Sequence, residues 1–316
     1  MSVSLKGKSL IALKDYSVEE VRYLLDLSHK VKEQKRNGEL HERFRGKSIA
    51  LLFEKRSTRT RCAFETAFGE EAGHVVFLST ADIQLGAKES VEDTARVLGR
   101  MFDCIQFRGF KQETVETLAK YAGVPVYNGL TDLFHPTQVL ADLLTIEEYA
   151  GRLKGASMCF VGDGRNNMAV SLLLGCAKMG VNYTILCPRE LNPGKDMIDL
   201  AGTFASASGA DIRVTDDKAA ALKGMDVIYT DVWASMGEEE KLAERKKLLG
   251  PYQVNSELMA MTGNDKTIFM HCLPAVKGNE VTADVVDGPA SAAWEEAENR
   301  KHTIKALMLA TLGLDT

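Results

Sequence analysis

The chain has 316 residues, of which 45% are hydrophobic, 26% charged and 7% aromatic, and this composition excludes a disordered, collagen-like or low-complexity protein. The length predicts two domains, because a single hydrophobic core seldom organises so many residues. With 39 lysines and arginines against 44 aspartates and glutamates, the net charge of −5 leaves no overall positive field to hold nucleic acid. Any anion that this protein binds should be small and held by a local group of cations.

The six cysteines lie far apart and form no C-x-x-C pair, so the sequence indicates neither a zinc site nor a disulfide framework. Residues 1–15 lack the continuous apolar stretch and the cleavage site of a signal peptide. The longest apolar region, residues 168–181, contains Lys178 and is too short to span a bilayer. We expect a cytoplasmic protein with reduced thiols and with no nucleic-acid or membrane partner.

Strand-like and helix-like segments alternate along the chain after an opening amphipathic helix at 18–36. In the first half we predict strands at 48–54, 74–79, 104–108 and 124–128, and helices at 60–72, 90–101, 113–122 and 137–149. In the second half we predict strands at 157–162, 183–187, 212–215, 227–231 and 267–273, and helices at 168–180, 193–206 and 290–312. Such alternation predicts parallel sheets with helices on both faces.

The pattern of strands starts afresh near residue 151, after the long helix of the first half. We therefore predict an α/β fold with two doubly wound parallel-sheet domains and a cleft between them. In such sheets, ligands bind beyond the carboxyl ends of the strands. Chemically active residues are expected in the loops that directly follow strands, and several of those loops are polar.

The first strand leads into the sequence EKRSTRTR at residues 54–61 and then into a helix. Hydroxyls and backbone N–H groups at a helix start, together with the positive end of the helix dipole, form an anion site. The four cations of this segment supply local positive charge. A capped helix with a solvated basic turn is the alternative, but hydroxyls interleaved with arginines favour the anion site.

Two further loops of the first half carry polar residues where strands end. Arg108 ends the third strand, where its planar guanidinium is suited to phosphate or to a carbonyl oxygen, although a surface ion pair is the alternative. The sequence FHPTQ at residues 134–138 brings a histidine and an amide to the start of a helix. A proline in the first helical turn also fits a simple cap, so neither loop alone decides a function.

In the second half, GDGRNN at residues 162–167 follows a strand and opens a helix. Asn167 replaces the third glycine of the dinucleotide motif G-x-G-x-x-G, which makes a nicotinamide site the weaker alternative. The paired asparagines suit the carboxylate of an amino acid, or a helix cap. Asp231, at another strand end, is placed to hold an ammonium group.

His271 and Cys272 lie together at the end of the last predicted strand. A cysteine nucleophile needs an activating base, and neighbouring residues of an extended strand point to opposite faces, so His271 is poorly placed to activate Cys272. A buried structural cysteine is the alternative reading, and it fits Cys272 less well than it fits the cysteines inside predicted strands and helices.

Three motifs together resemble those of the carbamoyltransferases, which transfer a carbamoyl group from carbamoyl phosphate to an amine. They are STRTR at 57–61, HPTQ at 135–138 and HCLP at 271–274, in this order. Further segments resemble the ornithine branch of the aspartate/ornithine carbamoyltransferase family rather than the aspartate branch: Asp231, SMG at 235–237, QLGAKES at 84–90 and DTAR at 93–96. The resemblance covers essentially the whole chain.

The resemblance implies an enzyme that carbamoylates the δ-amine of L-ornithine, giving L-citrulline and phosphate, in arginine biosynthesis or in arginine breakdown, with no cofactor and no metal. The implied carbamoyl-phosphate-binding residues are Ser57, Thr58, Arg59, Thr60, Gln84, Arg108, His135, Pro136, Thr137, Gln138, Cys272, Leu273 and Arg300. The implied ornithine-binding residues are Asn167, Asp231, Ser235 and Met236, and the implied catalytic residues are Arg108, His135, Asp231 and Cys272.

The resemblance also implies a carbamoyl-phosphate domain at 1–148, an ornithine domain at 149–290 and a last helix at 291–316 that returns to the first domain. Family members are trimers in which the loop that holds Gln84 enters a neighbouring subunit, so we expect a homotrimer, which further assembly can enlarge. Two alternatives remain: a related transferase that acts on putrescine or another amine, and a non-catalytic binding protein that keeps the fold.

Overall fold

Helices α5 (Pro136–Ala150) and α12 (Ala293–Leu312) each contribute residues to both of the units into which the chain divides. Unit 1 comprises Met1–Leu144 and Glu298–Thr316, and unit 2 comprises Thr145–Ala297. The structure is a computed structural model that describes residues 3–79, 89–234, 240 and 242–315. Each unit has its own parallel sheet and its own hydrophobic core.

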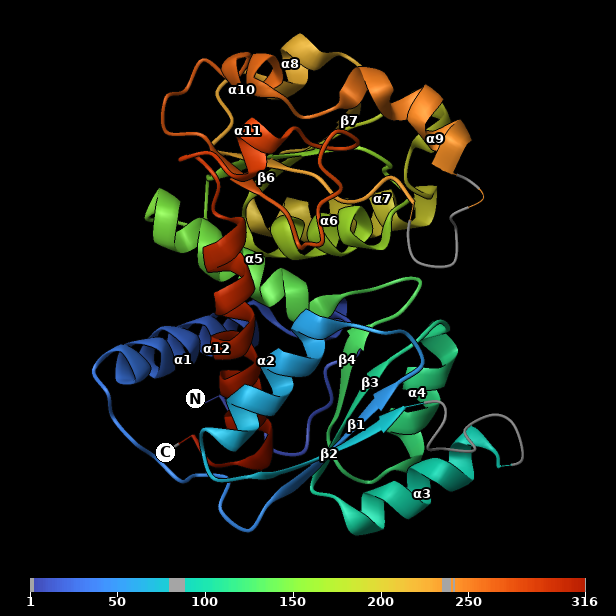
Figure 1. Ribbon diagram of the computed structural model, residues 1–316, viewed down its shortest axis with the longest axis vertical. Helices are drawn as coiled ribbons and strands as arrows, with labels where there is room; N and C mark the ends of the chain where they lie inside the picture. Colours follow the sequence, from blue (N-terminus) through green and yellow to red (C-terminus); the bar gives the residue numbers. More distant parts are fainter. Residues whose placement is uncertain (1–2, 80–88, 235–239, 241, 316) are drawn as a thin grey trace. The chain divides into compact units, whose positions relative to one another are not determined.

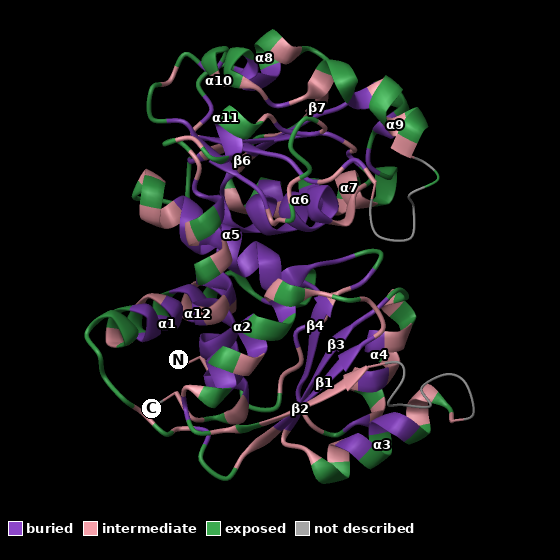
Figure 2. Cartoon of the chain, viewed as in Figure 1, coloured by how far each residue is buried: buried purple, intermediate pink, exposed green. Residues whose placement is uncertain are grey.

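Unit 1 is built on a four-stranded parallel sheet with the strand order β2-β1-β3-β4 (Figure 1). Its strands are β1 (Ser48–Phe53), β2 (His74–Ser79), β3 (Cys104–Arg108) and β4 (Val126–Leu130). Its other elements are the 3-10 turn η1 (Leu13–Asp15) and helices α1 (Val18–Arg36), α2 (Thr58–Gly69), α3 (Val91–Met101) and α4 (Gln112–Tyr121). The edge strand β2 is only partly buried, whereas β1 and β3 are almost wholly buried (Figure 2).

Helices cover both faces of this sheet, because successive side chains of each strand point to opposite faces. On one face, Leu52 of β1 and Phe107 of β3 belong to a core that includes residues of α3 and α4. On the other face, Tyr127 of β4 stacks on Phe64 of α2, and its hydroxyl lies 2.6 Å from Thr311 Oγ1 of α12. The carboxyl-terminal part of α12 therefore packs on unit 1.

Unit 2 is built on a five-stranded parallel sheet with the strand order β7-β6-β5-β8-β9. Its strands are β5 (Ser157–Val161), β6 (Asn182–Leu186), β7 (Ile212–Thr215), β8 (Val227–Tyr229) and β9 (Ile268–Met270). Its helices are α6 (Asn167–Met179), α7 (Lys195–Ser208), α8 (Lys218–Leu222), α9 (Leu242–Leu249), α10 (Ser256–Ala260) and α11 (Ala283–Val286), with 3-10 turns η2 (Arg189–Leu191) and η4 (Gly250–Tyr252).

Both faces of the second sheet are covered as well. Ile228 of β8 and Phe269 of β9 share a core with Leu222 of α8 and with residues of α11. On the opposite face, the hydroxyl of Tyr183 in β6 donates to the backbone carbonyl of Ala169 in α6 at 3.0 Å. The prediction of an α/β fold with two parallel sheets is confirmed.

The strand order places a topological switch in each sheet. In unit 1 the chain runs from β1 outward to β2 and then crosses to β3 on the other side of β1. In unit 2 it runs from β5 outward to β6 and β7 and then crosses to β8 on the other side of β5. At such a switch the loops after the two central strands diverge and leave room for a ligand. The loops after β1 and β3, and those after β5 and β8, are therefore the places to search for a site.

Two strands of unit 2 are shorter than predicted: those expected at 227–231 and 267–273 end at Tyr229 and Met270. Beyond these residues, backbone N–H groups donate to nearby side chains instead of to a neighbouring strand. The carboxylate that follows β8 accepts a hydrogen bond from the next backbone N–H at 2.8 Å, and an imidazole that follows β9 accepts one at 2.8 Å. Leu273 also has a φ of 59°, which a strand cannot continue.

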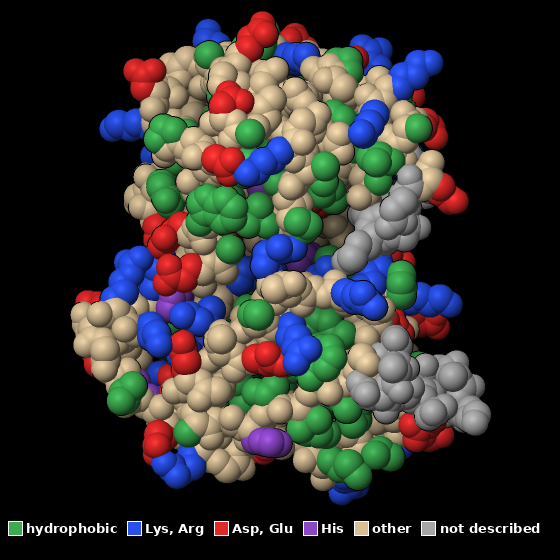
Figure 3. Space-filling model, viewed as in Figure 1, with side chains coloured by type: hydrophobic (Ala, Val, Ile, Leu, Met, Phe, Trp, Pro, Cys, Tyr) green, Lys and Arg blue, Asp and Glu red, His purple; other side chains and the backbone are tan. Residues whose placement is uncertain are grey.

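No helix in the described part of the chain combines the length and the apolar character needed to cross a bilayer. On the face shown in Figure 3, acidic and basic side chains are interspersed rather than gathered into one large patch of either sign.

Candidate active site

The first predicted site segment forms the start of α2 at the carboxyl end of β1. Ser57 is the N-cap of this helix, with an extended backbone and with its Oγ accepting the backbone N–H of Thr60 at 3.2 Å. The first-turn N–H groups, including those of Thr58 and Arg59, lie at the positive end of the helix dipole. This end of α2 presents donors suited to an anion.

Thr60 joins three elements of unit 1. Its side chain is fully buried, and its Oγ1 accepts from Arg108 Nη1 at 3.3 Å and from Arg300 Nη2 at 3.1 Å. Guanidinium groups only donate, so both lone pairs of this hydroxyl oxygen are used as acceptors. The hydroxyl hydrogen is consequently directed away from both arginines and is available to a further acceptor.

The start of α5 supplies a second group of predicted residues. Pro136 is the first helical residue, and the carbonyl of His135 accepts the backbone N–H of Gln138 at 3.1 Å. Thr137 is buried in the same turn. Arg300 Nη1 donates to Gln138 Oε1 at 2.8 Å, so α5 is linked through this arginine to the start of α2.

His135 lies in a buried and strongly positive environment. Burial lowers the pKa of its imidazole well below the usual value, and the charges of Arg300, Arg108 and Arg59 lower it further. The ring is therefore neutral at physiological pH, with one nitrogen donating and the other accepting. A neutral N–H donor among three arginines can polarise a carbonyl oxygen without being a source of protons.

In unit 2, Asp231 binds both of the loops that flank it. Its Oδ2 accepts from Asn166 Nδ2 at 3.1 Å, and its Oδ1 accepts from the thiol of Cys272 at 3.2 Å. Asn166 is itself the N-cap of α6 and accepts the backbone N–H of Met168 at 2.6 Å. Three strand ends, those of β5, β8 and β9, thus meet at one carboxylate.

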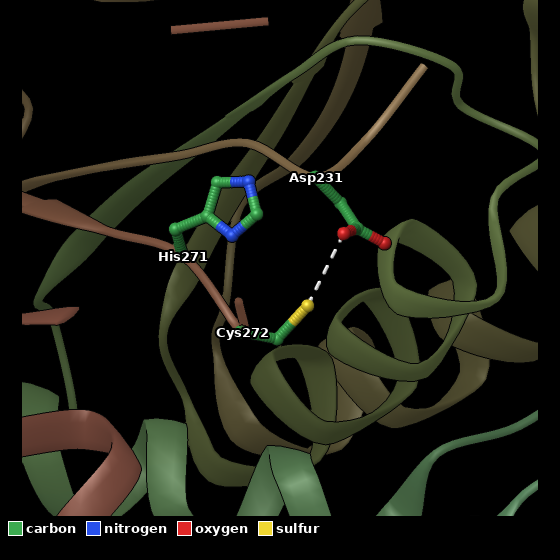
Figure 4. A group of neighbouring side chains, drawn as sticks. All are labelled: Asp231, His271 and Cys272. Carbon is green, nitrogen blue, oxygen red and sulfur yellow. Dashed lines mark hydrogen bonds between the residues drawn. The ribbon is translucent and has the colours of Figure 1, made fainter. Parts of the chain in front are cut away.

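His271 holds the backbone around Cys272. Its Nδ1 accepts the backbone N–H of Leu273 at 2.8 Å, and its Nε2 lies 3.4 Å from Glu280 Oε1, with both side chains buried. Its own backbone N–H donates to Glu296 Oε2 at 2.9 Å. Figure 4 shows the sulfur of Cys272 directed at Asp231. These contacts make His271 a support for the loop.

Among the described residues, Asp231, His271 and Cys272 form a group that could hold a metal ion. One ligand atom of each residue lies within 4.8 Å of the other two. Hydrogen bonds engage several of these atoms: Nδ1 of His271 accepts from the backbone N–H of Leu273, and the Cys272 thiol donates to Asp231. The arrangement is that of a hydrogen-bonded cluster.

Three of the predicted site residues, Gln84, Ser235 and Met236, lie outside the described part of the chain. Asn167 is the first residue of α6, and the contact to Asp231 comes from its neighbour Asn166. The sequence prediction considered both asparagines for a carboxylate but assigned only Asn167 to ornithine. It also missed Asp142, whose Oδ1 accepts from Gln138 Nε2 at 2.8 Å. The spacing of four residues on one helix was the signal for this pair.

Two family models match the chain. One, described as the carbamoyl-P binding domain of aspartate/ornithine carbamoyltransferase, matches residues 8–148, and the other, described as the Asp/Orn binding domain, matches residues 154–311. The chain belongs to the aspartate/ornithine carbamoyltransferase family. It is accordingly a carbamoyltransferase enzyme, and the carbamoyl-P model covers the loops after β1, β3 and β4 described above.

Relatives of this family match over nearly the whole chain. The ornithine carbamoyltransferase of Caldanaerobacter subterraneus subsp. tengcongensis is 65% identical over 312 residues, which are 99% of this chain and 100% of the relative. A catabolic ornithine carbamoyltransferase of Bacillus licheniformis is 55% identical, covering 99% of this chain and 98% of the relative. The solved structure of ornithine carbamoyltransferase from Pyrococcus furiosus is 44% identical and superposes with a TM-score of 0.95, covering 99% of each chain.

Proposed function

We propose that this carbamoyltransferase transfers the carbamoyl group of carbamoyl phosphate to the δ-amine of L-ornithine, giving L-citrulline and phosphate. The observation that carries the proposal is the meeting of Arg108 and Arg300 at Thr60, beside the start of α2. A dianionic phosphate and a developing negative charge on a carbonyl oxygen both require such donors.

In this proposal the phosphate binds at the start of α2, held by the hydroxyls and N–H groups of residues 57–60 and by Arg59, Arg108 and Arg300. Arg108 bridges the phosphate and the carbonyl oxygen. The last helix supplies Arg300 from the carboxyl-terminal end of the chain, which gives that helix a function beyond covering the sheet.

The carbonyl oxygen of carbamoyl phosphate is polarised by His135 and Thr60. His135 is suited to this role because its pKa, lowered by burial and by three arginines, keeps it a neutral N–H donor. Thr60 is suited because both of its lone pairs accept from arginines, which leaves its hydroxyl hydrogen to donate. Each such donor typically contributes about 3–4 kcal/mol to an acyl-transfer transition state. Gln138 Oε1 and the backbone carbonyl of Leu273 accept from the carbamoyl NH₂.

Ornithine binds to unit 2 in this proposal. Asn167 and the Met236 backbone bind the α-carboxylate, while Asp231 and Ser235 bind the α-ammonium. Cys272, fixed by its hydrogen bond to Asp231, lies beside the δ-amine. An amine of this type has a solution pKa of about 10.4 and attacks only when neutral, so the site must favour the neutral form. The proton is then taken by the departing phosphate or passes by way of Cys272.

The activity is tested with purified protein, carbamoyl phosphate and L-ornithine, and the product is measured as citrulline. Absence of citrulline with both substrates saturating contradicts the proposal. A panel containing putrescine and lysine beside ornithine tests the acceptor, and rates measured in both directions test whether synthesis or phosphorolysis of citrulline is favoured. The direction matters because a relative from Bacillus licheniformis is named a catabolic ornithine carbamoyltransferase.

We further propose that the protein acts as a homotrimer whose sites are shared between subunits through Gln84. Light scattering should give a mass about three times 34.7 kDa. Mixing inactive Gln84→Ala subunits with inactive Arg108→Ala subunits should restore activity, since a hybrid trimer contains some sites with neither substitution. Mixtures that stay inactive after confirmed subunit exchange contradict the shared site.

A further inference from the structure

We propose that Asp142 is a positioning residue for this reaction, which holds the side-chain amide of Gln138 with its oxygen toward the substrate. The inference rests on the proposed function, in which that oxygen accepts from the carbamoyl NH₂. Asp142 is fully buried on α5, one helical turn after Gln138.

The two contacts of the Gln138 amide decide its orientation. An amide presents an acceptor at one end and donors at the other, and a half-turn of the group exchanges them. Arg300 Nη1, which can only donate, lies 2.8 Å from one end, and Asp142 Oδ1 lies 2.8 Å from the other. Only one orientation satisfies both contacts, namely Oε1 toward Arg300 and Nε2 toward Asp142.

Asp142 is the partner that can hold this orientation throughout the reaction. Arg300 also contacts Thr60 and is expected to contact the phosphate, so its geometry changes when substrate binds and phosphate departs. Asp142 sits on the same rigid helix as Gln138 at the spacing of four residues that brings side chains together. A carboxylate acceptor for a buried N–H is also stronger than a neutral one.

Orientation matters because the two ends of the amide have opposite effects on the substrate. With Oε1 presented, Gln138 accepts from the carbamoyl NH₂. With Nε2 presented, two N–H donors face each other in a buried site, which carries the penalty of unsatisfied polar groups. The effect is confined to ligands that carry the carbamoyl NH₂, and inorganic phosphate does not.

The test uses Asp142→Leu, which removes the acceptor at similar volume, and Asp142→Asn, which keeps a neutral acceptor. Equilibrium titrations on the full-length protein measure binding of carbamoyl phosphate and, separately, of inorganic phosphate. We expect Asp142→Leu to lower the affinity for carbamoyl phosphate about 10- to 100-fold, which is the range for loss of a hydrogen bond to a charged group. Asp142→Asn should lower the affinity for carbamoyl phosphate by a smaller factor. In both variants the affinity for inorganic phosphate should stay within about threefold of that of the wild type.

A double-mutant cycle identifies the route of the effect. If Asp142 acts through Gln138, the double variant Gln138→Ala with Asp142→Leu should bind carbamoyl phosphate no worse than Gln138→Ala alone. Ser28→Ala is the matched control, since it removes another buried hydrogen bond of unit 1, to the backbone carbonyl of Leu24 at 2.6 Å. This control should leave both affinities unchanged.

The inference would be overturned if Asp142→Leu lowered the affinities for carbamoyl phosphate and inorganic phosphate equally, or if the losses of affinity from Gln138→Ala and Asp142→Leu were additive. Asp142 would then have only a structural role. If Asp142→Leu does not fold, the same selectivity measured with Asp142→Asn decides, and a loss common to both ligands rejects the positioning role. A wild-type protein that makes no citrulline refutes the proposed function instead. That outcome is distinct, because the selectivity for carbamoyl phosphate over phosphate is measured by binding alone.

Discussion

Replacing Thr60 with valine isolates one hydroxyl at the centre of the carbamoyl-phosphate site. The substitution keeps the shape of a fully buried side chain and removes the acceptor of two arginine hydrogen bonds, at 3.3 and 3.1 Å. Because both contacts are long for charge-assisted bonds, each should contribute about 1 kcal/mol, below the ordinary range. Loss of the hydroxyl as an oxyanion donor removes a further ~3 kcal/mol from the transition state.

These losses of about 5 kcal/mol together predict a fall in kcat/KM for carbamoyl phosphate of about 10³- to 10⁴-fold, with a fall in kcat of at least about 10²-fold. Initial rates of citrulline formation with both substrates varied measure the two constants. Thr60→Ser should recover most of the activity, because it keeps the hydroxyl. Thr66→Val on the same helix, which removes a hydroxyl bound to the carbonyl of Cys62, is the control with unchanged rates. A Thr60→Val enzyme within about threefold of wild type would refute this account.

Three further substitutions test the electrostatics of the two units. His135→Gln should lower kcat and weaken the dependence of stability on pH. Because the pKa of His135 is lowered in the folded protein, the unfolded chain takes up a proton below about pH 6.5 and the folded chain does not, so wild-type stability falls by up to about 1.4 kcal/mol per pH unit there. Glu70→Gln should cost about 1–2 kcal/mol in urea unfolding at pH 7, because hydrogen bonds from Lys305 and Lys35, against the opposing effect of partial burial, lower the pKa of Glu70 to about 2. Arg245→Ala breaks a nearly buried ion pair with Asp163 at 2.7 Å and should raise the ornithine KM about tenfold without changing carbamoyl-phosphate affinity.

Each of these predictions has an opposing result. A His135→Gln protein with the wild-type slope of stability against pH below 6.5 would contradict a neutral imidazole. For Glu70, the folded pKa lies below the unfolded one, so the stabilisation is present above about pH 4.5 and is lost toward pH 2; a difference from Glu70→Gln that persists through that range contradicts the ion-pair origin. Arg245 lies on α9 and Asp163 in the loop after β5 that leads to Asn167. An Arg245→Ala enzyme no different from Arg189→Ala, which removes an exposed ion pair, contradicts a contribution of the Arg245–Asp163 pair to ornithine binding.

Several elements around the candidate site could be predicted from the sequence, because the signals for them are local. Ser57 caps α2, and Pro136 opens α5, through contacts within one helical turn. The polar residues in the loops after β1, β3 and β5 stand out in the sequence, because each group lies between an apolar strand and a helix. The alternation of short strands and long helices was enough for the α/β class, since a parallel strand requires a crossover between neighbours.

The ends of β8 and β9 were predicted poorly for the opposite reason. A strand ends where its backbone N–H groups bond to side chains instead of to a neighbouring strand, as they do with Asp231 and His271. The periodicity of the sequence does not show where this happens. The sequence likewise did not show which of the two asparagines contacts Asp231, because adjacent asparagines at a helix start look equivalent and differ only in the direction that the cap imposes on each.

The sequence by itself determined the helix starts, the strand-end loops and the residue types gathered in them, because these depend on contacts between near neighbours. Only the tertiary structure decided which strand lies beside which, and hence that the loops after β1 and β3 share one switch point. It also decided that Arg300 reaches Thr60 across 240 positions of the chain. Such pairings depend on the packing of whole elements against a common sheet, and no short stretch of residues contains that information.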